Sequence, residues 1–277
     1  MTTSAYICPI CSTTLDIISS ENTYRCSNRH SFDVAKEGYV NLLPVQYKHS
    51  AEPGDSKAML NARRAFLEAG YYQPLAQAIA LLVSLNASSQ PLRLLDVGCG
   101  EGYYLRQLRQ HYPAALAIER HGMDIAKAAI AAAAKKDPTA NYCVASAQRL
   151  PYADGYFDVI SRVFAPSNAA ELQRVLKPAG HLLLVTPGPR HLTQLKDFIY
   201  TDVKEHPETA ELPTGFERLT SQRISRWITP DKEQRAALLQ MTPFAWRATP
   251  ENQQAIAEPE TLAIETDFIL TLARKQL

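Results

Sequence analysis

Three glycines and one acid stand at regular spacing in a short segment of this chain. Asp96 lies near the end of an apolar run, and Gly98, Gly100 and Gly102 follow at alternate positions. Glycine has no β-carbon, so this pattern lets the backbone approach a ligand closely where a strand turns into a helix. The dinucleotide-binding fingerprint has its third glycine where Tyr103 stands here. The segment therefore indicates a small-ligand site of another kind.

The pattern D-x-G-x-G-x-G, with its acid at the end of a strand, resembles motif I of class I S-adenosylmethionine (SAM) methyltransferases. SAM has no pyrophosphate for a helix N-terminus to hold. Its amino-acid tail and its sulfonium instead require close backbone approach and a nearby carboxylate. The plainer alternative is a glycine-rich turn in an unrelated α/β protein.

A second cluster of reactive residues lies near the N-terminus. Cys8 and Cys11 form a C-x-x-C pair, and Cys26 and His30 follow after fourteen intervening residues. Three thiolates and one imidazole at this spacing predict a structural Zn²⁺ site. Because four protein ligands leave no open position on the ion, we expect no catalysis by the metal. The alternative is a set of unrelated thiols beside a surface histidine.

Further stretches support a SAM site. Asp124 ends a predicted strand, where its carboxylate can accept hydrogen bonds from both ribose hydroxyls, and Glu119 is the weaker alternative. The stretches LPYADGYFDVI (150–160) and RVLKPAG (174–180) resemble two later motifs of these enzymes. Many relatives place an aspartate just before the first of these to meet the adenine amino group. Ser146 holds that position here, so its hydroxyl or the backbone of Ala145 and Ser146 takes that role.

Periodicity then predicts the elements that position these residues. Strands are expected over residues 92–97, 115–124, 142–145, 157–163 and 180–186. Helices are expected between them, over residues 103–109, 125–136 and 169–175. This alternation predicts a parallel, doubly wound α/β sheet with ligands beyond the carboxyl ends of its strands. Later strands at 216–228 and 262–273 suit an antiparallel edge pair, with a helix at 231–239 inserted between them.

The chain divides into three predicted parts. Residues 1–45 form a zinc-binding module with a short hairpin, 15–18 with 23–25. Residues 46–90 form a helical linker region with a polar segment at 49–55, a helix from near Ser56, a break at Gly70 and a second helix at 74–85. Residues 91–277 form the methyltransferase domain. The two remaining cysteines, Cys99 and Cys143, are expected to be buried and inert.

Composition excludes several classes of protein. The formal net charge of +1 gives no global electrostatic attraction to nucleic acid, so any RNA contact needs local patches. No stretch approaches the length of a membrane span, and the N-terminus lacks the layout of a signal peptide. The cysteine pattern does not suit a disulfide framework. We therefore expect a cytoplasmic protein with no membrane partner.

A more specific resemblance covers nearly the whole chain, from Cys8 to about Phe268. The zinc module, the methyltransferase core and the segments AKEGYVNLLP, PGDS, ARRAFL-x-AG-Y-Y-x-P, TPGPRHL and LLQMTPFAW resemble the RlmA family. Its members are 23S ribosomal RNA guanine-N1 methyltransferases. The resemblance implies methylation of a guanine in a 23S rRNA hairpin, with SAM as methyl donor and structural Zn²⁺. One branch modifies nucleotide 745 and another modifies 748, and the first looks closer.

The resemblance also implies site residues. Family contacts to SAM carry over onto Tyr72, the Gly102–Tyr103 turn and His191, which add to the predicted set of Asp96, Gly98, Gly100, Asp124 and Ser146. A packing role is the alternative for Tyr72. Phe164 follows the fourth predicted strand and is a candidate partner for stacking on the acceptor base, or else a core residue. No residue is assigned as a general base.

Three rival functions remain at this stage. The first is methylation of the 748-type guanine of the same hairpin. The second is a small-molecule or quinone methyltransferase, since the core motifs alone fit an RNA or a small-molecule substrate. A third rival is a non-catalytic RNA-binding protein, against which the intact Asp96 and glycine triplet argue. The zinc module favours the RNA reading, because a small substrate needs no extra recognition domain. A homodimer is compatible with the sequence but not required by it.

Overall fold

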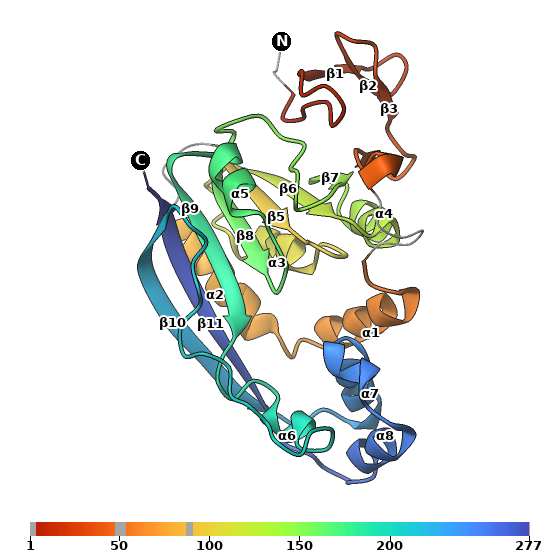
Figure 1. Ribbon diagram of the computed structural model, residues 1–277, viewed down its shortest axis with the longest axis vertical. Helices are drawn as coiled ribbons and strands as arrows, with labels where there is room; N and C mark the ends of the chain where they lie inside the picture. The colour runs from red at the N-terminus through yellow and green to blue at the C-terminus, as the bar shows by residue number, and fades with distance from the viewer. Residues whose placement is uncertain (1–3, 48–53, 87–90, 277) are drawn as a thin grey trace.

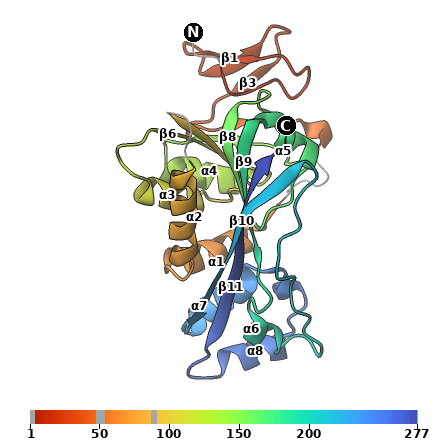
Figure 2. The ribbon, with the colours of Figure 1, turned by 90° about the vertical axis from the view of Figure 1, so that its left-hand side faces the viewer.

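The computed structural model describes residues 4–47, 54–86 and 91–276. The chain forms a small sheet at one end of an elongated molecule and a large sheet that runs through the rest (Figure 1, Figure 2). The small sheet has the order β1-β2-β3, and the large one has the order β10-β11-β9-β8-β5-β6-β7-β4. Part of the predicted linker, residues 49–53, lies outside the described residues.

The small sheet confirms the predicted hairpin. Strands β1 (Leu15–Ile18) and β2 (Thr23–Cys26) pair antiparallel, and β3 (Ser31–Asp33) pairs with β2 on its other edge. Leu15 is fully buried, but the sheet has few other apolar side chains to bury. So small a core needs another source of folding free energy.

The large sheet confirms the predicted α/β class, with mostly parallel strands and an antiparallel edge. Its strands in chain order are β4 (Val40–Asn41), β5 (Leu92–Val97), β6 (Ile118–Asp124), β7 (Asn141–Val144), β8 (Phe157–Val163), β9 (Leu176–Pro187), β10 (Phe216–Ile228) and β11 (Ile264–Lys275). Strands β4 to β9 pair parallel with their neighbours, whereas β11 pairs antiparallel with β9 and with β10. The chain leaves β5 toward β6 and returns on its other side through β8. That reversal opens a crevice at the carboxyl ends of the strands.

Helices cover both faces of the large sheet. The α-helices are α1 (Lys57–Glu68), α2 (Gln73–Leu85), α3 (Tyr103–His111), α4 (Lys127–Lys136), α5 (Ala169–Val175), α6 (Thr193–Lys196), α7 (Lys232–Gln240) and α8 (Pro250–Ala257), with 3₁₀ turns η1 (Val45–Tyr47) and η2 (Pro243–Trp246). Leu94 of β5 packs with α2, α3 and α4 on one face, and the next residue, Leu95, packs with α5 on the other. This alternation follows from the period of two in a strand.

The helix starts were well predicted. Ser56 caps α1, because its hydroxyl oxygen accepts a hydrogen bond from the backbone N–H of Met59 at 3.3 Å. Asp231 caps α7 in the same way, through the N–H of Gln234 at 2.8 Å. Helix α7 packs against α1, although the two helices are far apart in the sequence, and the pair lies in the lower half of the molecule in Figure 1. The prediction missed α6 and α8, which are short and carry a weak apolar pattern.

The N-terminal part is joined to the large sheet at two places. Strand β4, within the first 45 residues, adds to the edge of the large sheet beside β7. The backbone N–H of Ile7 donates to the carbonyl of Pro151 at 3.0 Å, and that of Ala153 donates to Ala5 at 3.1 Å. Between these bonds the ring of Tyr6 packs on Tyr152, with centroids 5.3 Å apart. Among the described residues, no helix is long and apolar enough to cross a membrane.

Candidate functional site

The four predicted metal ligands converge on one point. The Nδ1 atom of His30 lies 3.5 Å from Sγ of Cys8 and 3.4 Å from Sγ of Cys26, and the two sulfurs of Cys11 and Cys26 are 3.7 Å apart. All four donor atoms lie within 4.8 Å of one another. Bonds of about 2.3 Å to sulfur and about 2.0 Å to nitrogen put tetrahedral zinc ligands roughly 3.5 to 3.8 Å apart. The cluster therefore fits a structural zinc ion.

The local chain also suits this ion. Two turns present the ligands, one closed by the N–H of Ser12 on the carbonyl of Cys8 at 2.8 Å. Hydrogen bonds from Thr13 lower the pKa of Cys11 to about 5, which favours the thiolate that binds a metal. The site takes three of its ligands from the turns around the small sheet and the fourth, Cys26, from the end of β2, and it leaves no position open for a substrate.

The glycine turn lies at the carboxyl end of β5. Gly98, Gly100 and Gly102 all have positive φ, at +73°, +54° and +71°. A β-carbon on Gly98 would lie 2.4 Å from Cβ of Ala165, and one on Gly102 would lie 2.7 Å from the hydroxyl of Tyr142. A β-carbon on Gly100 would meet no atom of the described chain within 4 Å. The outer two glycines thus allow close packing, whereas Gly100 faces open space that a ligand can fill.

Asp96 carries a buried carboxylate with one unused oxygen. Its Oδ1 accepts a hydrogen bond from the hydroxyl of Ser161 at 2.6 Å, and only 2% of the residue is exposed. Its Oδ2 is buried and has no hydrogen-bond partner among the described residues. Burial raises the pKa of Asp96 to about 7. Such an arrangement costs stability, which is typical of a residue kept for a ligand.

Asp124 ties the end of β6 to the glycine turn. Its Oδ2 accepts from the backbone N–H of Gly100 at 2.9 Å, and its Oδ1 accepts from that of Ala126 at 2.9 Å. Each carboxylate oxygen has a second lone pair, so two hydroxyls of a ribose can still be bound. Glu119 lies near the opposite end of β6 and holds His121 at 2.7 Å and Tyr156 at 2.8 Å.

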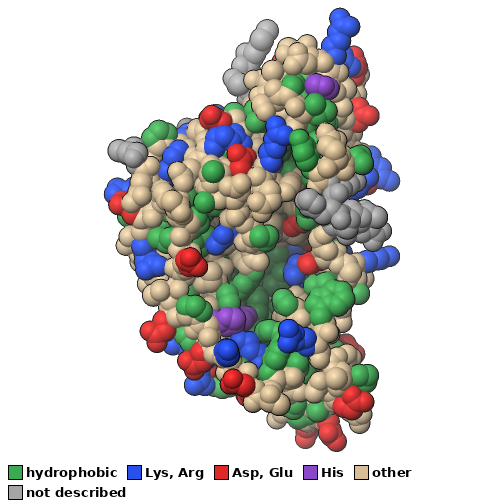
Figure 3. Space-filling view, viewed as in Figure 1, with side chains coloured by type: hydrophobic (Ala, Val, Ile, Leu, Met, Phe, Trp, Pro, Cys, Tyr) green, Lys and Arg blue, Asp and Glu red, His purple; other side chains and the backbone are tan. Residues whose placement is uncertain are grey.

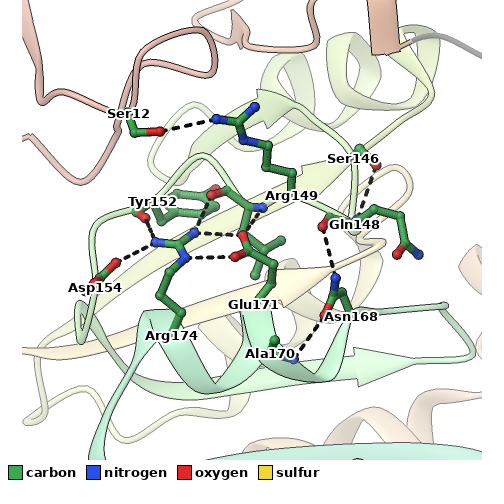
Figure 4. A network of polar contacts seen from close by, with 11 residues as sticks. Ser12, Ser146, Gln148, Arg149, Tyr152, Asp154, Asn168, Ala170, Glu171 and Arg174 are labelled. Carbon is green, nitrogen blue, oxygen red and sulfur yellow. Dashed lines mark hydrogen bonds and ion pairs between the residues drawn. The ribbon is translucent and has the colours of Figure 1, made fainter.

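Ser146 lies in a tight turn beside Asp124. The N–H of Ala145 donates to the carbonyl of Asp124 at 3.0 Å, and the Ser146 hydroxyl accepts from the N–H of Gln148 at 3.2 Å. Figure 4 shows how this turn is held: Arg149 reaches the hydroxyl of Ser12 in the zinc module at 3.2 Å. A cavity of about 480 Å³ lies beside Arg149, between Ile7 and Ser12 of the N-terminal part and residues 149–174 of the methyltransferase domain. The turn thus connects the metal module with the cofactor side of the sheet.

Tyr72 and His191 come together at the other side of the site. Both are buried, their ring centroids are 6.4 Å apart, and both rings pack on Phe268 of β11. The Nδ1 of His191 accepts the backbone N–H of Asp267 at 3.2 Å, and burial lowers the pKa of His191 to about 3. The ring is therefore neutral, with its proton on Nε2, which can donate to a ligand.

Tyr103 opens α3 directly after Gly102, and its ring is buried against Tyr104. Cys99 and Cys143 are buried as expected, and burial raises the pKa of Cys143 to about 12. The structure therefore gathers the predicted cofactor residues at one edge of the sheet and the metal ligands at one end of the molecule. Figure 3 shows a hollow below the zinc module, with hydrophobic side chains on its floor.

Sequence reasoning missed the support of the loop that carries His191. Asp267 is buried and accepts two hydrogen bonds from Arg223, at 2.7 and 2.8 Å, and a third from the backbone N–H of Arg190 at 2.9 Å. The side chain of Arg190 donates to the buried carboxylate of Glu265 at 2.7 Å, which also fixes this loop to β11. The signal was the polar run 265–267 at the start of an otherwise apolar strand.

Comparison with known proteins agrees with this geometry. A family model described as "RlmA, N-terminal" matches residues 6–51, and one described as "Methyltransferase domain" matches residues 95–184. A Bacillus subtilis (strain 168) protein named "Putative 23S rRNA (guanine-N(1)-)-methyltransferase YxjB" is 33% identical over 98% of both chains. A 23S rRNA (guanine(748)-N(1))-methyltransferase of Streptomyces fradiae is 34% identical over 88% of this chain and 86% of its own.

Solved structures show the same fold. The structure named "Complex between the Haloferax volcanii Trm112 methyltransferase activator and the putative methyltransferase" covers 81% of this chain with a TM-score of 0.50 and 16% identity. At this identity the likeness concerns the fold alone. The fold, the metal cluster and the near full-length relatives are consistent with one another.

Proposed function

Because this chain belongs to the RlmA family of 23S rRNA (guanine-N1)-methyltransferases, we propose that it transfers the methyl group of SAM to N1 of a guanine in a 23S rRNA hairpin. The observation that carries the proposal is the open space at Gly100, whose backbone N–H donates to Asp124 and which follows Asp96, with its unpartnered Oδ2, in the same strand-to-helix segment. The alignment with a family member over 98% of both chains supports the same function. A rRNA substrate also implies a cytoplasmic enzyme.

The chain's residues divide the cofactor among them. The turn at Gly98, Gly100 and Gly102, with Tyr103 and the carboxylate of Asp96, holds the amino-acid tail. Asp124 accepts from the ribose hydroxyls, and the turn at Ser146 meets the adenine. Tyr72 packs beside the tail, and His191 donates through Nε2 to its carboxylate, a role that the neutral ring suits.

The cofactor supplies an electrophilic methyl group on a positive sulfur. Held by these residues, SAM would present this methyl group to guanine N1; its sulfur would leave as the neutral thioether of S-adenosylhomocysteine, and the N1 proton would pass to solvent. A paired guanine hides N1 within the duplex, so the target base must lie in a loop or leave the stack. Alignment of N1, carbon and sulfur is the main contribution that the rigid walls of the site make.

The zinc module serves recognition rather than chemistry. Its four protein ligands would fill the coordination sphere of the ion. The module also lies at one end of the molecule, apart from the residues that we assign to SAM. We assign residues 1–45 to RNA recognition, 46–90 to the helices that link the parts, and 91–277 to SAM binding and transfer. Strand β4 belongs to the first part by sequence and to the large sheet by pairing, so it fixes the two relative to each other.

Within the hairpin we assign the 745-type guanine. The segments GCGEGYY and LLQMTPFAW support this choice, because they resemble the branch that modifies that nucleotide. The experiment is incubation of the full chain with unmodified 23S rRNA and SAM labelled in its methyl group. Reverse transcription then maps the product, since N1-methylguanine blocks pairing and stops the polymerase. One stop at the 745-type position is the expected result, and a stop at 748 would reverse the assignment.

A further inference from the structure

Phe164 has an unusual backbone conformation at the mouth of the site. It comes directly after β8 and has a φ of +55°, in the left-handed region. A bulky side chain is rare and unfavourable there, and such residues persist only where the surrounding structure holds them. Its backbone N–H donates to the carbonyl of Val185 at 3.2 Å, which anchors it to β9. The strained backbone of Phe164 is therefore held in place by a hydrogen bond to the neighbouring strand.

The loop after Phe164 is fixed to the cofactor turns on two sides. Ala165 packs against the glycine turn so closely that Gly98 has no room for a β-carbon, which would lie 2.4 Å from Cβ of Ala165. Further along the loop, the N–H of Asn168 donates to the carbonyl of Ala147 at 3.3 Å, next to Ser146. Phe164 is thus placed relative to both halves of the cofactor site.

The ring of Phe164 is only partly used in packing. It stacks on His191, with centroids 5.8 Å apart and an angle of 29° between the planes, and it lies 5.9 Å from the ring of Phe268. Nevertheless 46% of the residue is exposed. A phenylalanine that served the core would be buried and would not need a strained backbone. Exposure and strain together are typical of a residue kept for a ligand.

We propose that Phe164 is the surface on which the target guanine stacks, and that it orients N1 toward the methyl group of the cofactor. This inference rests on the proposed function. A base that has left its duplex loses its stacking partners, and an exposed aromatic face replaces one of them. Because His191 covers one side of the ring, the base has only the remaining face to use. Phe164 is then a positioning residue that acts through the geometry of the acceptor.

Kinetics with an unmodified hairpin of 23S rRNA test this role. Phe164→Ala should lower kcat/KM for the hairpin by roughly 5- to 150-fold, the range expected for one lost stacking contact. The Kd for SAM, measured by calorimetry, should change by less than about threefold, because the cofactor turns keep their own contacts. Phe164→Tyr should restore most of the rate. Trp227→Ala is the control, since Trp227 is also an exposed aromatic (58%) but lies on the edge strand β10.

Phe164→Gly separates function from stability. Glycine adopts positive φ without strain, so this variant should melt above Phe164→Ala while being as slow as that variant. If Phe164 had only a structural role, the more stable variant, Phe164→Gly, would also be the faster of the two. As a readout independent of turnover, 2-aminopurine at the target position should fluoresce more strongly when bound to Phe164→Ala than to the wild type, because a stacked base is quenched.

The outcomes are distinct. If the wild type methylates the hairpin and Phe164→Ala does so at the same kcat/KM, the stacking role is overturned and the proposed function stands. The role is equally overturned if the variant loses SAM affinity in proportion to its rate. If the wild type itself methylates no guanine of the hairpin, the proposed function fails, and this inference fails with it.

Discussion

At the scale of single residues, the glycine turn makes a sharp distinction between its three members. Gly98 and Gly102 are hemmed in by Ala165 and Tyr142, whereas Gly100 faces open space. Substitutions at the outer two should therefore disturb packing, and substitution at Gly100 should obstruct the ligand. The spacing of the glycines alone could not reveal this difference, because it depends on which neighbours the fold brings near.

Gly100→Val should abolish SAM binding and leave the fold intact. The side chain would fill the space for the ligand, and a valine at a φ of +54° should also cost about 1–2 kcal/mol of stability. Calorimetry with SAM and circular dichroism of the free protein measure the two effects. An unchanged Kd would remove this turn from the cofactor site. Gly70→Val, at a turn with a φ of +86° outside the site, is the matched control for strain.

Asp96→Asn should stabilise the free protein at high pH and weaken SAM binding. The pKa of Asp96 is raised to about 7 in the folded chain, above its ordinary value near 3.8. The folded state therefore binds the proton more tightly, and stability is lost as pH rises from about 4 to about 7. Relative to the variant, the wild-type free energy of unfolding should fall by about 2–4 kcal/mol across that window.

Denaturant unfolding at several pH values, without SAM, gives this difference. Asp16→Asn, on an exposed strand position of the small sheet, is the control for the loss of a carboxylate. A difference between wild type and Asp96→Asn that does not depend on pH would mean that the carboxylate is not destabilised by its burial.

At the scale of elements, much of the architecture could be predicted from periodicity and caps. Strand β8, strand β10 and helix α5 have the predicted bounds, because apolar alternation and turn residues delimit them. Strand β4 was missed, since two residues carry no period and the strand that they pair with, β7, lies far away in the sequence. Strand β9 begins at Leu176, four residues before its predicted start, because Leu176 already pairs with Phe157 of β8.

The way in which the zinc module packs on the large sheet could not be predicted from the sequence either. The bonds between residues 5–7 and 151–153 and the packing of Tyr6 on Tyr152 depend on two surfaces that meet only in the folded chain. Likewise the strained Phe164 could be named as a stacking candidate, but its exposure and its φ could not be foreseen. Local patterns report elements, and long-range contacts decide how the elements form a site.

One tightly bound zinc ion per chain should stabilise the small module. Cys11→Ser, or chelation, should lower the metal content, loosen residues 4–33 and abolish methylation of the hairpin. The Kd for SAM should change by less than about threefold, because the cofactor residues lie on the large sheet and on the segments next to it, outside the zinc module. Elemental analysis, proteolysis and calorimetry measure these effects. Ser12→Ala, in the same turn but not a ligand, should retain the metal. Carefully purified protein without zinc would contradict the assignment.

At the scale of the whole molecule, the chain has no strong overall charge, with a formal net charge of +1. Binding of the hairpin must therefore depend on local cationic contacts to phosphate. Such contacts release counterions, so the affinity for the hairpin should fall as salt rises, with a linear slope of log K against log salt concentration. Fluorescence anisotropy at several salt concentrations measures the slope. Affinity that does not depend on salt would mean that phosphate contacts are absent.

The most direct test of the central claim is mass spectrometry of a single product. The full chain is incubated with an unmodified 23S rRNA hairpin and SAM, and the RNA is digested to oligonucleotides and nucleosides. We expect one methyl group per hairpin, on one guanine, as N1-methylguanosine, and no product with Gly100→Val. A methyl group on another atom or another base, or transfer to a small molecule but not to the hairpin, would contradict the account.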